Sequence, residues 1–267
     1  MKKTTHLDAD RFRRDAEKYA EYLATPEGRL RIELALANLQ EFLPKSKASL
    51  CALDIGGGTG ALAVRLARIG FNVTLLDPSP PMLELARIAA REAGVAERID
   101  LKAGDTGQIS ELFPAGSFDV VLCHNVLEFV DDPGAVLGDV ARMVRGPSSI
   151  LSILVRSRAG EVFKAALQSG DLAAAENGLT AEWGEESLYG GKVRLFTAGD
   201  VDAMLKDASL TMIAERGIRV LADYLPAQIS RSAEYSRIFS LERELGKRQE
   251  FAGVARYIQC VARLAGP

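Results

Sequence analysis

Two carboxylates flank a glycine cluster in the first third of the chain. Asp54 precedes Gly56, Gly57 and Gly58, and Asp77 follows the next apolar segment. Glycine has no Cβ and adopts positive φ readily, so the backbone there can pass close to a ligand. Carboxylates accept hydrogen bonds from ammonium groups and from hydroxyls. The spacing, about one strand–helix–strand unit between the acids, therefore indicates a pocket for a nucleotide-type cofactor.

The elements that must position these residues follow from the hydrophobic pattern. Apolar runs predict strands over 50–55, 72–76, 98–102, 118–123 and 149–155, and helical spacing predicts helices over 60–69, 81–93, 107–113 and 133–144. Such alternation implies an α/β fold with a doubly wound parallel sheet and right-handed crossovers. Two late strands, predicted over 211–220 and 253–263, complete a mostly parallel seven-stranded sheet.

The remaining segments are predicted to be additions to one domain that spans residues 1–267. Residues 8–43 form an N-terminal helical segment with a break at 24–28, where Thr25 suits a helix cap and Pro26 a first turn. Residues 157–195 interrupt the alternation, and we interpret them as a cap of helix and loop over the pocket; the alternative is a solvated connector. A helix over 198–208 follows, with Thr197 as its cap, and a charged helical stretch over 223–248 forms a second cap insertion.

Composition excludes several classes of protein. The 267 residues are 48% hydrophobic and 26% charged, which suits a folded chain, and a net charge of −3 gives no general attraction to nucleic acid. The N-terminus lacks the apolar core of a signal peptide and no long apolar run is present, so we expect a cytoplasmic protein away from membranes. Three widely spaced cysteines and two histidines predict neither a disulfide framework nor a metal site. Oligomeric state does not follow from the sequence.

Polar or glycine residues follow four successive predicted strands. In an open parallel sheet, ligands bind beyond the carboxyl ends of the strands. We expect the glycines to approach the ligand's amino-acid part, and Asp54 either to anchor the loop or to meet the ligand's ammonium group. Asp77 is expected to accept from both ribose hydroxyls. The remaining candidates are Asp105 and Thr106 for an adenine ring, Met82 for the face of that ring, and His124 for a carboxylate or the reaction centre.

Each of these residues also has a structural alternative. The glycines could serve only a tight turn, Asp105 could cap a helix, Met82 could belong to the core and His124 could satisfy a carbonyl. The convergence of four strand ends favours the ligand-binding interpretation over these separate explanations.

Two cofactor classes are compatible with the glycine cluster. Gly56-x-Gly58-x-x-Ala61 fits the loose pattern of NAD- and FAD-binding proteins, in which Asp77 would hold an adenosine ribose. Three features favour S-adenosylmethionine (SAM) instead: Asp54 before the first glycine, the Gly104-Asp105 pair after the third strand, and the late strand pair.

Several segments resemble a known family. Residues 122–133 are similar to the fourth-strand motif of class I SAM-dependent methyltransferases, which have a Rossmann-like sheet with an antiparallel finish. Residues 25–31, 53–60, 217–225 and 255–259 together resemble the bacterial tRNA 5-carboxymethoxyuridine methyltransferases, over roughly 10–263. That family methylates the carboxylate of a modified wobble uridine in tRNA to a methyl ester. The resemblance implies that Arg31 reaches the SAM carboxylate, and it places Gly56, Gly57, Asp77, Thr106 and His124 at cofactor positions.

The chain departs from this family in two places. The family's cap is strongly basic, whereas residues 151–200 here hold five Lys or Arg against seven Asp or Glu. Binding to a polyanion relies on neutralised phosphates, so this cap is an unusual surface for tRNA. Ala222 stands where the family has a histidine. Residues 211–267 hold nine Lys or Arg against six Asp or Glu, so a basic face can still form there.

If the methyl acceptor is a carboxylic acid, the enzyme must orient it but needs no catalytic base, because a carboxylate is already ionised at neutral pH. The candidates for orienting it are Arg219, Tyr224, Arg256 and Tyr257, each of which could instead be a structural residue. Two competing hypotheses remain: methylation of a small-molecule acid, amine or phenol, and a non-catalytic SAM-binding protein.

Overall fold

The computed structural model describes residues 14–45, 50–186, 188 and 190–266. Part of the predicted N-terminal helical segment, residues 8–13, lies outside the described residues. Within them, that segment forms α2 (Ala16–Ala24) and α3 (Pro26–Gln40). The break between the two helices falls where it was predicted: Thr25 Oγ1 accepts from the Gly28 amide at 3.1 Å, and Pro26 opens the first turn of α3.

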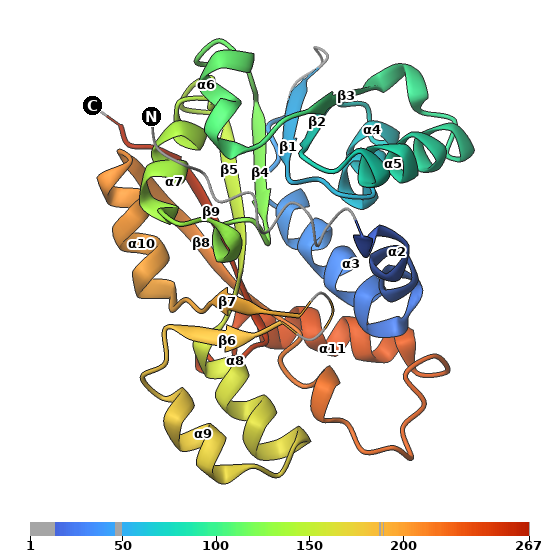
Figure 1. The fold of residues 1–267 in the computed structure, drawn as a ribbon, viewed down its shortest axis with the longest axis vertical. Helices are drawn as coiled ribbons and strands as arrows, with labels where there is room; N and C mark the ends of the chain where they lie inside the picture. Colours follow the sequence, from blue (N-terminus) through green and yellow to red (C-terminus); the bar gives the residue numbers. More distant parts are fainter. Residues whose placement is uncertain (1–13, 46–49, 187, 189, 267) are drawn as a thin grey trace.

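A seven-stranded, mostly parallel sheet forms the centre of the molecule, which confirms the predicted fold class (Figure 1). The strand order is β3-β2-β1-β4-β5-β9-β8. Strands β1 to β5 are parallel to one another, whereas β9 is antiparallel to both β5 and β8. Their bounds are β1 Cys51–Ile55, β2 Asn72–Asp77, β3 Ile99–Ala103, β4 Val120–His124, β5 Ile150–Arg156, β8 Leu210–Ile218 and β9 Tyr257–Leu264. The order reverses between β1 and β4, which is where such sheets bind ligands.

Helices cover both faces of this sheet (Figure 1). One apolar cluster joins a face of the sheet to α3, α4 (Ala61–Arg68) and α5 (Pro80–Glu92). Another joins the opposite face to α6 (Ile109–Leu112), α7 (Pro133–Ala141) and α10 (Ala198–Asp207). Val120 and Leu122 of β4 enter the first cluster, and Val121 and Cys123 enter the second. Burial on both sides explains why the sequence of this strand is apolar throughout.

Two predicted boundaries are wrong, by four residues at the last strand and by two at β8. The last strand begins only at Tyr257, because a turn over residues 253–256 follows the short helix α12 (Gln249–Ala252). Strand β8 ends at Ile218, because Arg219 adopts a φ of 60° and turns the chain out of the sheet.

The cap predicted over 157–195 contains more than helix and loop. It consists of α8 (Arg158–Phe163), a π-helical turn η4 (Lys164–Gln168), α9 (Leu172–Gly178) and an antiparallel hairpin of β6 (Trp183–Glu185) and β7 (Lys192–Arg194). The prediction missed the hairpin, because three-residue strands are too short to show an alternating pattern.

The second insertion, 223–248, is helical only in part. It begins within the 3-10 turn η5 (Ala222–Tyr224), crosses an irregular stretch and becomes α11 (Tyr235–Lys247). Ile238 of α11 packs into an apolar cluster with Leu30 and Leu34 of α3 and with Tyr257. This packing places the loop before α11 beside the carboxyl end of the sheet. Each helix in the described part of the chain is too short or too polar to cross a membrane.

Candidate active site

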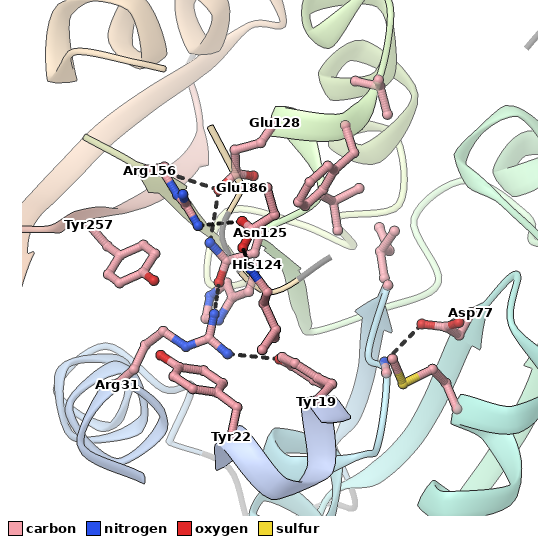
Figure 2. Close-up of a pocket in the computed structure, with 18 of the residues that line it drawn as sticks. Tyr19, Tyr22, Arg31, Asp77, His124, Asn125, Glu128, Arg156, Glu186 and Tyr257 are labelled. Carbon is pink, nitrogen blue, oxygen red and sulfur yellow. Dashed lines mark hydrogen bonds and ion pairs between the residues drawn. The ribbon is translucent and has the colours of Figure 1, made fainter. Parts of the chain in front are cut away.

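A cavity of about 430 Å³ opens at the carboxyl ends of the parallel strands, next to α2, α3 and the cap (Figure 2). Most of the predicted site residues line it: Arg31, Gly56, Gly58, Asp77, Met82, Asp105, Thr106, His124, Arg219, Arg256 and Tyr257. Asp54, Gly57 and Tyr224 do not. The fold therefore brings together residues from almost the whole length of the sequence.

The glycine loop and Asp77 form one hydrogen-bonded unit. Gly56 and Gly58 have φ values of 63° and 54°, which few other residues adopt without strain. The Gly58 amide donates to Asp77 Oδ2 at 2.9 Å, and the Ser79 amide donates to Asp77 Oδ1 at 2.8 Å. Each of these oxygens keeps a second lone pair. The buried carboxylate thus fixes the loop and can still accept from hydroxyls in the cavity.

Asp54 lies below the loop instead of in the cavity. A Cβ at Gly57 would lie 2.6 Å from Leu75 Cγ and 2.9 Å from Asp54 Oδ2, so only glycine fits there. Burial, and then the charge of Asp77, raises the pKa of Asp54 to about 7. Burial also raises the pKa of Asp77 to about 6. The two acids therefore share a region in which negative charge is costly without hydrogen-bond donors.

Arg31 is a buried cation without a carboxylate partner among the described residues. Its guanidinium donates to Asn125 Oδ1 at 2.7 Å and to the Tyr19 hydroxyl at 2.8 Å, while Nε has no partner. The side chain is 5% exposed and lies over the rings of Tyr22 and Tyr257 (Figure 2). Buried charges are normally paired, so this position fits an anionic ligand group such as a carboxylate.

Asp105 and Met82 line the opposite end of the cavity. Asp105 Oδ1 accepts from the Gly107 amide at 2.8 Å, and Gln108 Oε1 accepts from the Asp105 amide at 3.1 Å. Both atoms belong to a capping box of the turn η2 (Thr106–Gln108). Asp105 therefore caps a turn, as its structural alternative predicted, and it also lines the cavity together with Thr106.

His124 is connected to the core by a buried polar network. Its Nε2 lies 2.9 Å from Ser152 Oγ, which accepts from Gln259 Nε2 at 3.1 Å. Gln259 Oε1 in turn accepts from Asn38 of α3 at 3.0 Å. Burial, and then the charge of Arg31, lowers the pKa of His124 to about 3, so the ring is neutral. The other ring nitrogen of His124, Nδ1, is buried and has no hydrogen-bond partner among the described residues.

The wall opposite the glycine loop carries charges of alternating sign, here named the arginine–carboxylate chain. Arg156 pairs with Glu186 and, at 3.4 Å, with Glu161. Arg256 then links Glu161 at 2.6 Å to Asp223 at 3.7 Å, and Arg219 completes the chain through Asp223. These three arginines are therefore neutralised within the protein.

Tyr257 lies beside this chain and close to Arg31 (Figure 2). Its ring is 5% exposed and lines the cavity. Burial opposes ionisation of the phenol, but the charges of the surrounding arginines, Arg156 and Arg219 foremost, outweigh it and lower the pKa of Tyr257. Its hydroxyl is therefore a stronger hydrogen-bond donor to an anion than an ordinary phenol. Tyr224, by contrast, directs its hydroxyl to the Gly160 carbonyl at 3.3 Å.

Sequence reasoning missed several lining residues. Asn125 follows His124 at one of the polar strand ends that the sequence indicated, but it was not chosen as a site residue. In the structure it lines the cavity and has a φ of 53°, a conformation that clusters at functional sites. Others gave no local signal, because they reach the cavity only through long-range packing: Tyr19, Tyr22, Glu128, Arg156, Lys164, Gln168, Glu186 and Asp223. Within the described residues, no cluster of three or more His, Cys, Asp or Glu side chains could hold a metal ion.

Comparison with known proteins identifies the class of enzyme to which this fold and cavity correspond. Residues 53–151 match the family described as a methyltransferase domain. Magnesium protoporphyrin IX methyltransferase from Synechocystis PCC 6803, solved with bound S-adenosylhomocysteine (SAH), has the same fold, with a TM-score of 0.63 at 14% identity over 97% of this chain and 99% of that one. The chain is a SAM-dependent methyltransferase with the class I fold, and its cofactor is SAM.

Two curated proteins are similar to this chain in sequence. The chain is similar to tRNA 5-carboxymethoxyuridine methyltransferase of Escherichia coli (strain K12), with 28% identity over 253 residues that cover 93% of this chain and 94% of that protein. Ubiquinone biosynthesis O-methyltransferase of Xanthomonas euvesicatoria pv. vesicatoria (strain 85-10) is 36% identical over 108 residues, which cover 40% of this chain and 44% of that protein. The resemblance predicted from the sequence is thereby confirmed.

Proposed function

We propose that this methyltransferase acts on a carboxylate, and that its acceptor is 5-carboxymethoxyuridine at the wobble position of tRNA, which it converts to the methyl ester. The observation that carries the proposal is the extent of the similarity to the tRNA-modifying relative, which covers 93% of this chain. The ubiquinone relative covers only 40%. A likeness that includes the cap and the late strands is informative about the acceptor, because those segments adjoin the half of the cavity that the glycine loop does not line.

The cofactor end of the cavity has candidate groups for the carboxylate, the ribose and the adenine of SAM. We assign the SAM carboxylate to Arg31, the ribose hydroxyls to Asp77, and the adenine to the side formed by Met82, Asp105 and Thr106. The buried Arg31 guanidinium, which has no carboxylate partner in the described part of the chain, supports the first assignment, and the second lone pairs of the Asp77 oxygens support the second. SAM bound in this way supplies an activated methyl group.

The acceptor end can orient an acid without a catalytic base. A carboxylate is ionised at neutral pH, so alignment and exclusion of water supply the acceleration. Tyr257 is the best-placed donor, since its hydroxyl has a lowered pKa and its ring lines the cavity. Arg219 and Arg256 support it from the arginine–carboxylate chain. Tyr224 is no longer a candidate, because it lies outside the lining residues.

One observation favours a second acceptor class. The cap as a whole carries more acids than bases, which suits a small molecule better than a polyanion. A small-molecule acid would use the same wall of the cavity. This alternative predicts activity on small acids in the complete absence of RNA.

Nucleoside mass spectrometry of tRNA separates these acceptors. In a strain that lacks the gene, 5-carboxymethoxyuridine should accumulate and its methyl ester should disappear. Purified enzyme with SAM should then restore the ester in that tRNA and release SAH. An unchanged nucleoside profile would exclude the tRNA acceptor, and tight SAM binding without SAH release from any cell extract would point to a non-catalytic protein.

A further inference from the structure

The cations that line the cavity differ in whether the protein already neutralises them. Arg156, Arg219 and Arg256 are all paired within the arginine–carboxylate chain. Arg31 has no carboxylate partner within residues 14–45, 50–186, 188 and 190–266, and the proposed function assigns it to the cofactor. Lys164 is the remaining cation of the lining, and it has neither an ion pair nor a hydrogen bond to any described residue.

The local backbone directs Lys164 toward the cavity. Helix α8 changes at Phe163 into the π-helical turn η4, which holds Lys164 and Gln168. Both of these residues line the cavity; Lys164 is half-buried, and Gln168 lies at the solvent-exposed edge beside Leu167, which is 61% exposed. Turns of this kind are rare and are frequently found at functional sites. Turn η4 packs against η5, which carries Asp223 of the arginine–carboxylate chain.

The acidic residues of the cap do not neutralise Lys164. Glu186 of the cap lines the cavity and is already paired with Arg156, while Glu161 lies outside the lining and is paired with both Arg156 and Arg256. Asp200 lies 3.7 Å from Arg158, away from the lining residues. The cap is thus acidic in total but presents an uncompensated positive charge at its cavity face.

We propose that Lys164, assisted by the Gln168 amide, forms an anion subsite that selects acceptors bearing a carboxylate or a phosphate. An ammonium group and an amide both donate hydrogen bonds to such oxygens. The proposal rests on the proposed function, because it assigns the other half of the same cavity. Within that function the anion is either the carboxylate of the modified base or a phosphate of the neighbouring backbone.

Calorimetry on the SAH-loaded protein tests the subsite without turnover. One titrant is the nucleoside 5-carboxymethoxyuridine, which has a carboxylate and no phosphate. The other is an anticodon stem-loop RNA with an unmodified wobble uridine, which has phosphates and no carboxylate. The variants are Lys164→Gln and Lys164→Glu, and Lys192→Gln on the cap hairpin is the matched control, since Lys192 is exposed and lies outside the lining.

Lys164→Gln should weaken the binding of either the nucleoside or the RNA about tenfold relative to the wild type. Lys164→Glu should weaken the same binding further, whereas Lys192→Gln should leave it unchanged. The affinity for SAH and the melting temperature should stay at the wild-type values. A loss confined to the nucleoside identifies the carboxylate as the anion, and a loss confined to the RNA identifies a phosphate.

Equal affinities of wild type and both Lys164 variants for both titrants would overturn the subsite, and the proposed function would stand if the wild type still bound the nucleoside. A wild-type protein that bound SAH but neither titrant would instead refute the proposed acceptor and the subsite together.

Discussion

The Arg31 guanidinium lies 2.7 Å from Asn125 Oδ1, so a helix that precedes the first strand is tied to the end of the fourth. Asn125 has a φ of 53°, and its side-chain amide donates to Glu128 Oε1 at 2.8 Å. Glu128 Oε1 also accepts from the Arg156 amide at the end of β5. This series of contacts holds a buried positive charge in the lining of the cavity.

Replacement of Arg31 should reduce cofactor affinity more than stability. Arg31→Ala removes a charge-assisted donor pair, so the Kd for SAM should rise about 100-fold, and Arg31→Lys should recover only part of the loss because an ammonium group lacks the planar fork. Calorimetry with SAH measures this directly. The control is Arg29→Ala on the same helix, where Arg29 is exposed and pairs with Glu33. Equal effects of the two alanine variants would contradict the assignment.

The buried acids should make the ligand-free protein less stable as the pH rises. Asp54 and Asp77 have ordinary pKa values near 3.8 and folded values of about 7 and about 6, so the folded state binds protons more tightly than the unfolded state. Their contribution to stability is fully present below about pH 4 and is lost as the pH rises through about 7. Thermal melts across this range should show the decline, and Asp54→Asn should make it shallower. A slope unaffected by Asp54→Asn would contradict the pKa shift.

Glu242 should be needed to hold the loop that carries Arg219. Its carboxylate is fully buried and accepts from the backbone amides of Val220, Leu221 and Ala222, directly after the positive φ of Arg219. Glu242→Gln replaces an acceptor oxygen with a donor and leaves amides unpaired, at a cost of about 2 kcal/mol. The melting temperature should fall by roughly 5 °C and the affinity for SAH should not change.

Glu244→Gln is the control for this prediction, because Glu244 lies on the same helix and is exposed. Should the two glutamine variants melt at the same temperature, Glu242 would have no special part in holding the loop.

Gly57 should be essential for packing although it does not line the cavity. A methyl group there would lie 2.6 Å from Leu75 Cγ, so Gly57→Ala should destabilise the protein by about 1–3 kcal/mol. Gly146→Ala is a suitable control, since a Cβ at Gly146 would have no atom within 4 Å. Chemical denaturation of both variants measures the difference, and similar midpoints would show that the loop can shift to accept a side chain.

The cofactor half of the site could be predicted from the sequence because its residues follow strand ends. Glycines with positive φ, Asp77 and His124 each stand directly after an apolar run, and the order of parallel strands brings those ends together. Asp54 shows the limit of this reasoning, because position along the chain does not say on which side of a loop a carboxylate lies.

The acceptor half could not be derived in the same way. The arginine–carboxylate chain joins Arg156 of β5 to Glu186 of the cap and to Asp223 beyond β8, and its pairings depend on tertiary packing alone. Lys164 was unremarkable in the sequence, because the π-helical turn that directs it inward has no local pattern. The hairpin of β6 and β7 escaped prediction for a similar reason.

The most direct test of the account is a crystal structure of the protein grown with SAH. The account predicts that the SAH carboxylate lies within hydrogen-bonding distance of the Arg31 guanidinium and that both ribose hydroxyls donate to Asp77. SAH bound elsewhere, or bound in the cavity with Arg31 and Asp77 both unengaged, would contradict it.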